Sequence, residues 1–332
     1  MPSRTSPSLP AHRDVGRRAL IAGAVALAAA PAAAQATWPS QPIRLVVPFP
    51  PGGLTDVLGR LVGERLQALG QPVVVDNKPG AATQVGAALV AKAPPDGHTL
   101  LVATSTTLGI VPHLYARPLI RVEEFQPVAM LGNVTFFLLA RPDFPARDVA
   151  GLVAAMRARP GGLSYGSPGA GTAHHLLVEL IQARESVRAT HVPYQGSAKA
   201  IVDLIEGRID FMFLDASVAL PQMASGKVRV LAASGARRHP TAPDVPALTE
   251  SLPGLDLQAW QSVVAPAGTP PPVVARLNSE LNKALAEAAT VEQLSKVGVE
   301  ATPMSVQDFV ALLRRDSGRW ADLVQRSGAK VE

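Results

Sequence analysis

The chain has 332 residues, of which 47% are hydrophobic and 17% are charged, a composition typical of a globular protein with enough core for two domains. Its formal net charge is +5, but four arginines and one aspartate lie in the first 36 residues, which leaves the rest near +2. That charge, with no basic tract interleaved with aromatic residues, argues against a nucleic-acid partner. The absence of cysteine excludes disulfides, thiolate metal sites and cysteine nucleophiles, and we expect no metal site and no cofactor.

The N-terminal segment has the pattern of an export signal. Three arginines precede an alanine-rich apolar run over 19–30, and Ala34-Gln35-Ala36 has the small residues that signal peptidase accepts. A membrane anchor is the alternative, but the run is shorter than the roughly 20 residues that a bilayer core requires. We therefore predict a signal peptide over 1–36. The Arg17-Arg18 pair leaves twin-arginine and general secretion both open as the route of export.

The rest of the chain alternates short β-branched runs with helical patterns, which favours sheets covered by helices on both faces. The first set of predicted strands covers 43–49, 72–77 and 99–104, and its helices run from Thr55 or Asp56 to Leu69 and from Thr83 to Lys92. The second set has strands at 163–167, 190–194, 209–215 and 228–234, and helices from His174 to Ala183 and ending near Glu206. Two such sets predict an α/β protein with two lobes, each a parallel-dominated sheet flanked by helices.

Two apolar segments are predicted to connect the lobes. The run 134–140 could pass from the first lobe to the second, and 260–268 could bring the chain back before C-terminal helices at about 272–288 and 305–327. We therefore assign residues 37–139 and 258–332 to lobe 1 and residues 140–257 to lobe 2. Two crossings predict a cleft between the lobes with two hinge strands.

Small and polar residues follow the predicted strands, as in the loops 50–53 and 167–172. Ligands of open parallel sheets bind at the carboxyl ends of the strands, where the next helix presents free N–H groups and its positive dipole end. Apart from Lys78, these loops carry no lysine or arginine. We expect a small carboxylate held by dipoles and neutral donors, although the glycines could simply form tight turns.

Several single residues have two interpretations each. Asp56 is either an N-cap or a ligand group, and Asn77 either stabilises its turn or reaches into the cleft. His175, one turn into a predicted helix, is more often structural. Tyr194 could be both a wall and a hydrogen-bond donor, and Asp215 either caps the next helix or faces the cleft.

Enzyme signatures are absent from the sequence. There is no G-x-S-x-G elbow and no Walker loop, and the segment 169–174 lacks the last glycine of the dinucleotide fingerprint. No set of serine, histidine and aspartate is suggested by position, so we predict no catalytic residues.

The same motifs resemble one family along the whole exported chain. The segments that carry the resemblance are Trp38-Pro39, Pro42–Asp56, Val75–Ala81, Ala93–Leu101, Tyr165–Thr172 with His175-Leu176, His191–Gly196, Pro243–Pro246 and Ala265–Pro270. In this order they resemble the tripartite tricarboxylate transporter receptors, also called Bug proteins.

The resemblance implies a type II-like periplasmic binding protein that closes on a small carboxylate, namely a dicarboxylate, a tricarboxylate, an acidic amino acid or an aromatic acid. It implies ligand contacts from the loops after the first strand of each lobe, here Phe49, Gly53, Asp56, Ser167, Gly169 and Thr172. Other cleft loops contribute Asn77, Thr104, Tyr194, Gly196, Ser197 and Asp215. It also implies a monomer that works with integral membrane transporter subunits or a membrane sensor.

The chain departs from the family pattern in three places. Ala82-Thr83-Gln84 replaces a glycine pair, the segment 117–122 replaces a tyrosine-aspartate turn, and His98 replaces a common aromatic. We expect the first departure to change the floor of the pocket. Two other functions remain open at this point, an exported α/β enzyme acting on a small organic acid and a ligand sensor without a transport role.

Overall fold

The computed structural model describes residues 1, 3 and 38–331, and the residues from Gln41 onward form one compact unit. The predicted signal peptide, its cleavage site and the arginine pair lie outside the described residues, so their interpretation stays a prediction. Within residues 38–331, no helix combines the length and apolar character needed to cross a membrane.

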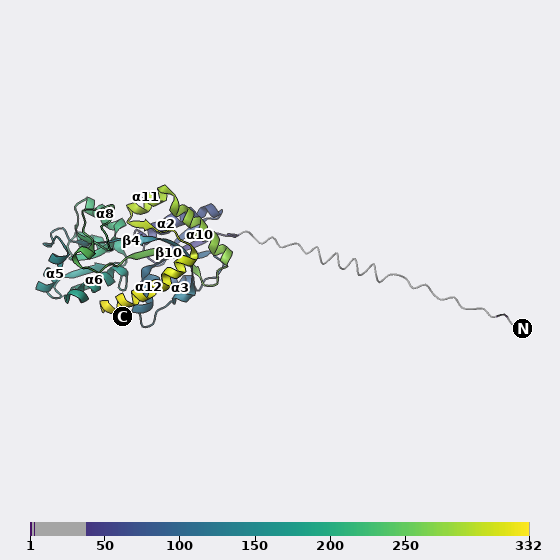
Figure 1. Cartoon of the computed structure of the whole chain (residues 1–332), viewed down its shortest axis with the longest axis horizontal. Helices are drawn as coiled ribbons and strands as arrows, with labels where there is room; N and C mark the ends of the chain where they lie inside the picture. The colour runs from purple at the N-terminus through teal and green to yellow at the C-terminus, as the bar shows by residue number, and fades with distance from the viewer. Residues whose placement is uncertain (2, 4–37, 332) are drawn as a thin grey trace. The chain divides into compact units, whose positions relative to one another are not determined.

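The first lobe is built on a six-stranded sheet with the order β11-β4-β10-β3-β1-β2. Its strands are β1 Ile43–Val47, β2 Val73–Asn77, β3 Thr99–Thr104, β4 Phe125–Val134, β10 Ala259–Pro266 and β11 Val299–Ala301. Its helices are α2 Leu54–Leu66, α3 Gln84–Ala91, α4 Val111–Leu114, α10 Pro271–Ala286, α11 Ala288–Lys296 and α12 Val306–Ser327 (Figure 1). Short turns η1 Gln67–Leu69 and η3 Val122–Glu124 and a π-helical segment η2 Thr106–Ile110 complete it.

The second lobe is built on a five-stranded sheet with the order β7-β6-β8-β5-β9. Its strands are β5 Phe136–Ala140, β6 Ser164–Ser167, β7 Thr190–Pro193, β8 Phe211–Asp215 and β9 Arg229–Ala233. Its helices are α5 Val149–Ala158, α6 Ala173–Glu185, α7 Ser197–Ile205, α8 Ala216–Ala224 and α9 Leu248–Ser251 (Figure 1).

The prediction of a two-lobed α/β protein is confirmed, but the prediction of parallel-dominated sheets is wrong. Among the described strands of the first sheet, only the β1–β2 and β1–β3 pairs are parallel, whereas β10–β3, β10–β4 and β11–β4 are antiparallel. The second sheet has two parallel and two antiparallel pairs. Both sheets are mixed because β10 and β11 in the first sheet and β5 in the second run against the other strands of their sheets, whereas β4 runs in the same direction as β1, β2 and β3.

The first crossing also differs from the prediction. The run predicted as one strand is divided at Thr135, since β4 ends at Val134 and β5 begins at Phe136. The strand β5 pairs with β8 and β9, so the chain enters the second sheet at Phe136, four residues before the predicted start of lobe 2 at residue 140. The return agrees better, because β10 pairs with β3 and β4 from its first residues onward.

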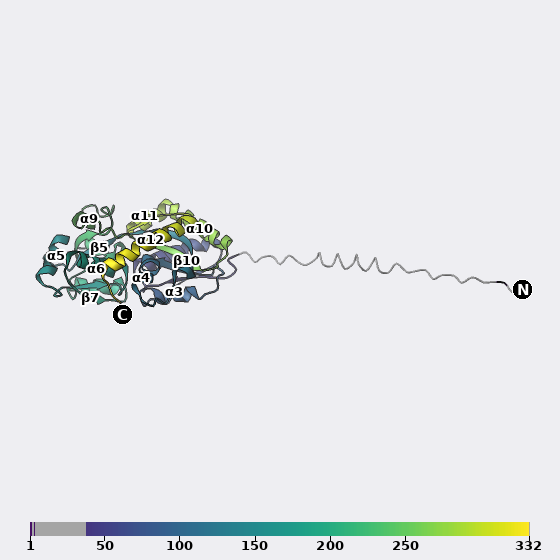
Figure 2. The ribbon, with the colours of Figure 1, turned by 60° about the horizontal axis from the view of Figure 1, so that its bottom comes forward.

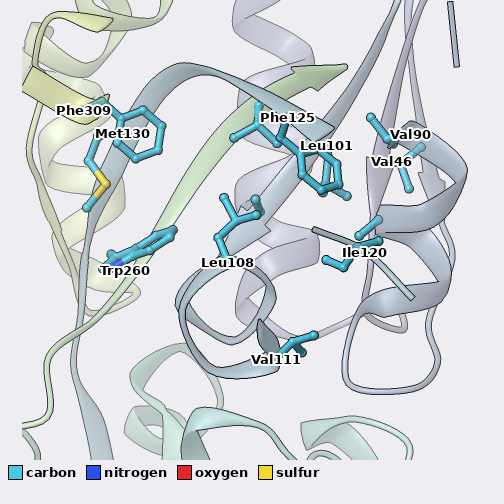
Figure 3. Close-up of a cluster of buried hydrophobic side chains, with 13 residues drawn as sticks. Val46, Val90, Leu101, Leu108, Val111, Ile120, Phe125, Met130, Trp260 and Phe309 are labelled. Carbon is cyan, nitrogen blue, oxygen red and sulfur yellow. The ribbon is translucent and has the colours of Figure 1, made fainter. Parts of the chain in front are cut away.

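The C-terminal helix α12 of lobe 1 also contacts lobe 2. It packs against β4 and η2 of the first lobe and against α6 of the second, and Figure 2 shows α12 extending from the side of α10 toward α6. On the first lobe it covers a core in which Trp260 meets Phe309 edge to face, with ring centroids 6.3 Å apart (Figure 3). The Trp260 indole donates to Asp316 of α12 at 2.7 Å, which fixes the helix to β10.

Candidate ligand-binding cleft

A cavity of about 40 Å³ lies where the loops of the two sheets face each other. Lobe 1 lines it through the loop after β1, the end of β3 and the start of β10, and lobe 2 through the starts of α6 and α7 and the end of β8. The volume is enough for roughly three water molecules, or for the head group of a small ligand. Six of the predicted site residues line it, namely Phe49, Gly53, Thr104, Gly196, Ser197 and Asp215.

Several helix N-termini converge on this cavity. Helix α2 begins directly after Gly53, α7 directly after Gly196 and α8 directly after Asp215, and all three of these residues line the cavity. The first N–H groups of a helix have no partner within the helix, and the N-terminal end carries positive partial charge. No lysine or arginine is among the described residues that line the cavity. The site is therefore suited to an anion held by dipoles and neutral donors.

Asp56 and Asn77 lie outside the cavity lining and brace the loop that forms it. The Asp56 carboxylate accepts hydrogen bonds from the Gly52 amide at 3.1 Å, from Arg60 at 3.1 Å and from Asn77 Nδ2 at 2.9 Å. Asn77 Nδ2 also donates to the Phe49 carbonyl at 3.0 Å. Burial alone would raise the pKa of Asp56, but these hydrogen bonds outweigh it and lower the pKa. The prediction that Asp56 is the N-cap of this helix is wrong, because α2 begins at Leu54 and its N-cap is Gly53.

The hydroxyls of the loop after β6 are engaged within lobe 2. Ser167 Oγ lies 2.7 Å from His191 Nε2 and accepts from the Gly169 amide at 3.2 Å, and the Ser167 side chain is fully buried. Thr172 Oγ1 donates to the Gly169 carbonyl at 2.8 Å. These residues fix the shape of the loop, and none of the three lines the inner cavity.

A second, outer cavity of about 420 Å³ adjoins the first and includes Gly169, Thr172 and Tyr194 in its lining. The two cavities share Pro50 and Gly196, whose backbones approach closely enough that a Cβ on Gly196 would lie 3.1 Å from Pro50 Cγ. Gly196 also has φ +95°, so the contact between the lobes here depends on glycine.

The departure at Ala82-Thr83-Gln84 affects the outer cavity. Ala81, Ala82 and Thr83 adopt left-handed φ values of 45°, 49° and 79° and line the outer cavity, but not the inner one. The expectation that this departure changes the floor of the pocket thus concerns the outer cavity, and it stays a prediction.

Tyr194 lines the outer cavity, but its hydroxyl forms a hydrogen bond outside the cavity. The hydroxyl donates to Asp203 at 2.7 Å. Burial, and then the hydrogen bond to Asp203, raise the pKa of Tyr194 to about 12. Tyr194 is therefore both a wall residue and a hydrogen-bond donor, but its donor is used on Asp203.

His174 is one of the cavity residues that sequence reasoning missed. It lines the inner cavity, is 6% exposed, and neither ring nitrogen has a hydrogen-bond partner within the described chain. Its neighbour His175 is structural, as expected, because its Nδ1 accepts from the Gly171 amide at 3.1 Å and its ring stacks on His191. The position of His174 in the first turn of a helix that starts at the cleft was the available signal.

Other missed lining residues join the lobes or the cavity walls. Thr106 Oγ1 accepts from the Ala173 amide at 3.1 Å, a hydrogen bond between η2 of lobe 1 and α6 of lobe 2. Gln261 of β10 donates to Thr55 Oγ1 at 3.1 Å. Both contacts depend on strands and helices far apart in sequence, which local patterns cannot reveal.

The structure brings the side chains of Ser167 and His191 together, but the serine is not accessible to a ligand in the cavity. Ser167 is the partner of His191, yet its side chain is 0% exposed and outside the inner cavity. Burial, and then the neighbouring His175, lower the pKa of His191 to about 3. A buried serine that a cleft ligand cannot reach is not placed for nucleophilic attack.

Two α/β lobes around a cleft lined by helix N-termini define a periplasmic solute-binding protein of the two-lobed class. A family model for the tripartite tricarboxylate transporter family receptor matches residues 59–329, and the chain belongs to this family. Protein BugT of Bordetella pertussis is 37% identical over 314 residues, which cover 92% of this chain and 94% of the relative.

Solved structures of the same kind carry small dicarboxylates. The Rhodopseudomonas palustris protein Rpa4515 with adipate matches with a TM-score of 0.85 and 33% identity, covering 89% of this chain and 100% of that protein. MatC from the same organism, with bound malate, matches with a TM-score of 0.82 and 33% identity, covering 86% and 100%.

Proposed function

We propose that this chain is a periplasmic receptor that binds a small carboxylate between its lobes and delivers it to a membrane transporter of the tripartite tricarboxylate type. The observation that carries the proposal is the convergence of the α2, α7 and α8 N-termini on a cavity whose described lining has no lysine or arginine. Backbone donors and dipoles can hold an anion without a salt bridge. The adipate and malate of the solved relatives are ligands of this kind.

The location and partners follow from the family and the N-terminal segment. A receptor of this family acts beside a transporter, and the predicted signal peptide over residues 1–36 would deliver it to the periplasm. We propose a monomer that binds without catalysing a reaction. The enclosed Ser167 supports a binding role over that of an exported enzyme.

A calorimetric and thermal-shift screen of di- and tricarboxylates, acidic amino acids and aromatic acids tests the proposal. A true ligand at 100 times its dissociation constant should stabilise the protein by roughly 2.7 kcal/mol. Recovery of unchanged acid after long incubation is expected for a receptor, and turnover would support the enzyme instead.

Gly53→Val tests the location of the site. Gly53 has φ −92°, which any residue adopts, and an added Cβ would meet no atom within 4 Å, so the side chain should enter the cavity without disturbing the fold. We expect a loss of carboxylate binding with unchanged thermal stability of the free protein. Gly318→Val, at an exposed position of α12 where an added Cβ would meet no atom within 4 Å, is the matched control. Unchanged affinity in Gly53→Val would place the site elsewhere.

A further inference from the structure

Lobe 2 presents a hydrogen-bond acceptor to the cavity in addition to the helix N-termini. Asp215 is 6% exposed and lines the cavity at the end of β8. Ser197 Oγ donates to its Oδ2 at 3.2 Å, but its Oδ1 receives no hydrogen bond from the described residues. His174 Nε2 lies 3.4 Å from that oxygen without forming one.

His174 is held in place by packing rather than by polar contacts. Its ring lies against Phe136 with centroids 4.2 Å apart, and both ring nitrogens are buried without partners. An unpaired buried polar atom is costly, and buried polar groups are almost always satisfied. His174 and Asp215 both line the cavity, and His174 Nε2 lies 3.4 Å from Asp215 Oδ1, so one molecule bound there could contact both side chains.

The charges around the cavity define what that molecule must carry. A carboxylate group of the ligand supplies acceptors for the helix N-termini, but it would repel Asp215. No lysine or arginine among the described lining residues neutralises Asp215. A donor on the ligand, close to its carboxylate, would satisfy Asp215 and convert an unfavourable contact into a charge-assisted hydrogen bond.

We infer, on the basis of the function proposed above, that the cavity selects carboxylic acids bearing a hydroxyl or ammonium group beside the carboxylate. Asp215 and His174 recognise this hydrogen-bond donor. Plain dicarboxylates such as adipate lack it, whereas hydroxy acids such as malate carry it. Asp215 and His174 are thus specificity-determining residues of the cleft.

Matched acids test the inference on the unmodified protein. Calorimetry at one pH and salt concentration compares succinate with malate and aspartate, glutarate with 2-hydroxyglutarate and glutamate, and phenylacetate with mandelate and phenylglycine. In the series that binds, we expect the hydroxyl or the ammonium acid to bind about tenfold or more tightly than the plain acid. The better of the two identifies the donor.

Asp215→Asn tests the residue assignment. The side chain keeps its size and can still accept from Ser197, so we expect the preference for the donor-bearing acid to fall by about tenfold while affinity for the plain acid is retained or improved. Asp244→Asn removes one exposed carboxylate of lobe 2 outside both cavities and should leave the preference unchanged. His174→Phe, which keeps a ring against Phe136, should also reduce it.

The outcomes separate the two proposals. Plain acids that bind as tightly as their donor-bearing partners would overturn the selectivity while leaving the carboxylate receptor intact. A preference that survives in both Asp215→Asn and His174→Phe would overturn the residue assignment. A failure of every acid to bind would contradict the proposed function itself.

Discussion

At the scale of single residues, the cleft separates side chains that face the cavity from those that hold its loops. Ser197 and Asp215 line the cavity, whereas Ser167 and Asp56 are engaged with His191 and Arg60. A loop residue can thus affect binding by two routes. Direct contacts should change affinity, and bracing contacts should first change stability.

Ser167→Ala and Ser197→Ala distinguish the routes. Ser167→Ala leaves the buried Nε2 of His191 without its partner, so we expect the free energy of unfolding to fall by about 1–3 kcal/mol. Ser197→Ala should instead weaken carboxylate binding by about 0.5–1.5 kcal/mol. Denaturant unfolding and calorimetry on both variants measure the two effects, and equal loss of affinity in both would contradict this division.

Asp56 should make a pH-dependent contribution to stability. Its pKa in the folded protein is below the ordinary value of 3.8, so the contribution is fully present above 3.8 and is lost as the pH falls through the folded pKa. Asp56→Asn removes this titration. We therefore expect the difference in unfolding free energy between the two proteins to shrink as the pH is lowered from 5 to 2, and a difference independent of pH would refute the assignment.

At the scale of elements, α12 is the helix on which the packing of both lobes depends. Asp316 accepts from the indoles of both Trp260 and Trp320 at 2.7 Å, which ties the helix to β10 and to itself. Trp320 in turn packs so closely on η2 that a Cβ on Gly109 would lie 2.6 Å from its ring. The Asp316 carboxylate thus fixes the position of α12, the helix that also packs against α6.

Asp316→Ala should be strongly destabilising. Two buried indole N–H groups would lose their acceptor, at about 1–3 kcal/mol each. Asp322→Ala on the same helix removes only an exposed pair with Arg326 and should cost less than about 1 kcal/mol. Thermal and denaturant unfolding compare the two, and similar costs would show that the indoles find other partners.

At the scale of the whole molecule, the two lobes are in contact around the cavity. The Thr106–Ala173 hydrogen bond and the Pro50–Gly196 contact join the two lobes at the wall of the cavity. The chain passes from the first sheet to the second at Thr135 and returns just before Ala259. Both lobes border the cavity at these contacts, so we expect ligand entry to involve separation of the lobes by motion about the two connections.

Gly196→Ala should hinder closure. The added Cβ would lie 3.1 Å from Pro50 Cγ, and φ +95° is unfavourable for alanine. Gly161→Ala also places alanine at a positive φ, +72°, but its Cβ would meet no atom within 4 Å, so it serves as a control for backbone strain in lobe 2. We expect Gly196→Ala to weaken binding and to reduce the ligand-induced decrease in radius of gyration measured by solution scattering, and equal behaviour of the two variants would argue against closure at this contact.

The sequence by itself determined most of the βαβ strands and helices, the two-lobed α/β class, the family and the loops that border the cleft, but it missed most of β4, all of β11 and the helices α4, α5, α8, α9 and α11. These features depend on local periodicity, glycine-rich turns and motifs that act over a few residues. Six of the predicted site residues reach the inner cavity for this reason, since Thr104 and Asp215 end strands and the other four lie in the loops or helix starts that follow strands.

Only the tertiary structure decided which polar side chains turn toward the ligand space. Whether His174 or His175 faces the cavity depends on the rotation of α6 against the second sheet, and Asp56 is withdrawn because Asn77 and Arg60 meet it across the loop. The antiparallel pairing of β10 with β3 joins residues more than 150 positions apart. Such contacts arise from the packing of segments that are distant in sequence. Their free energy depends on both segments, so a local sequence pattern does not predict them.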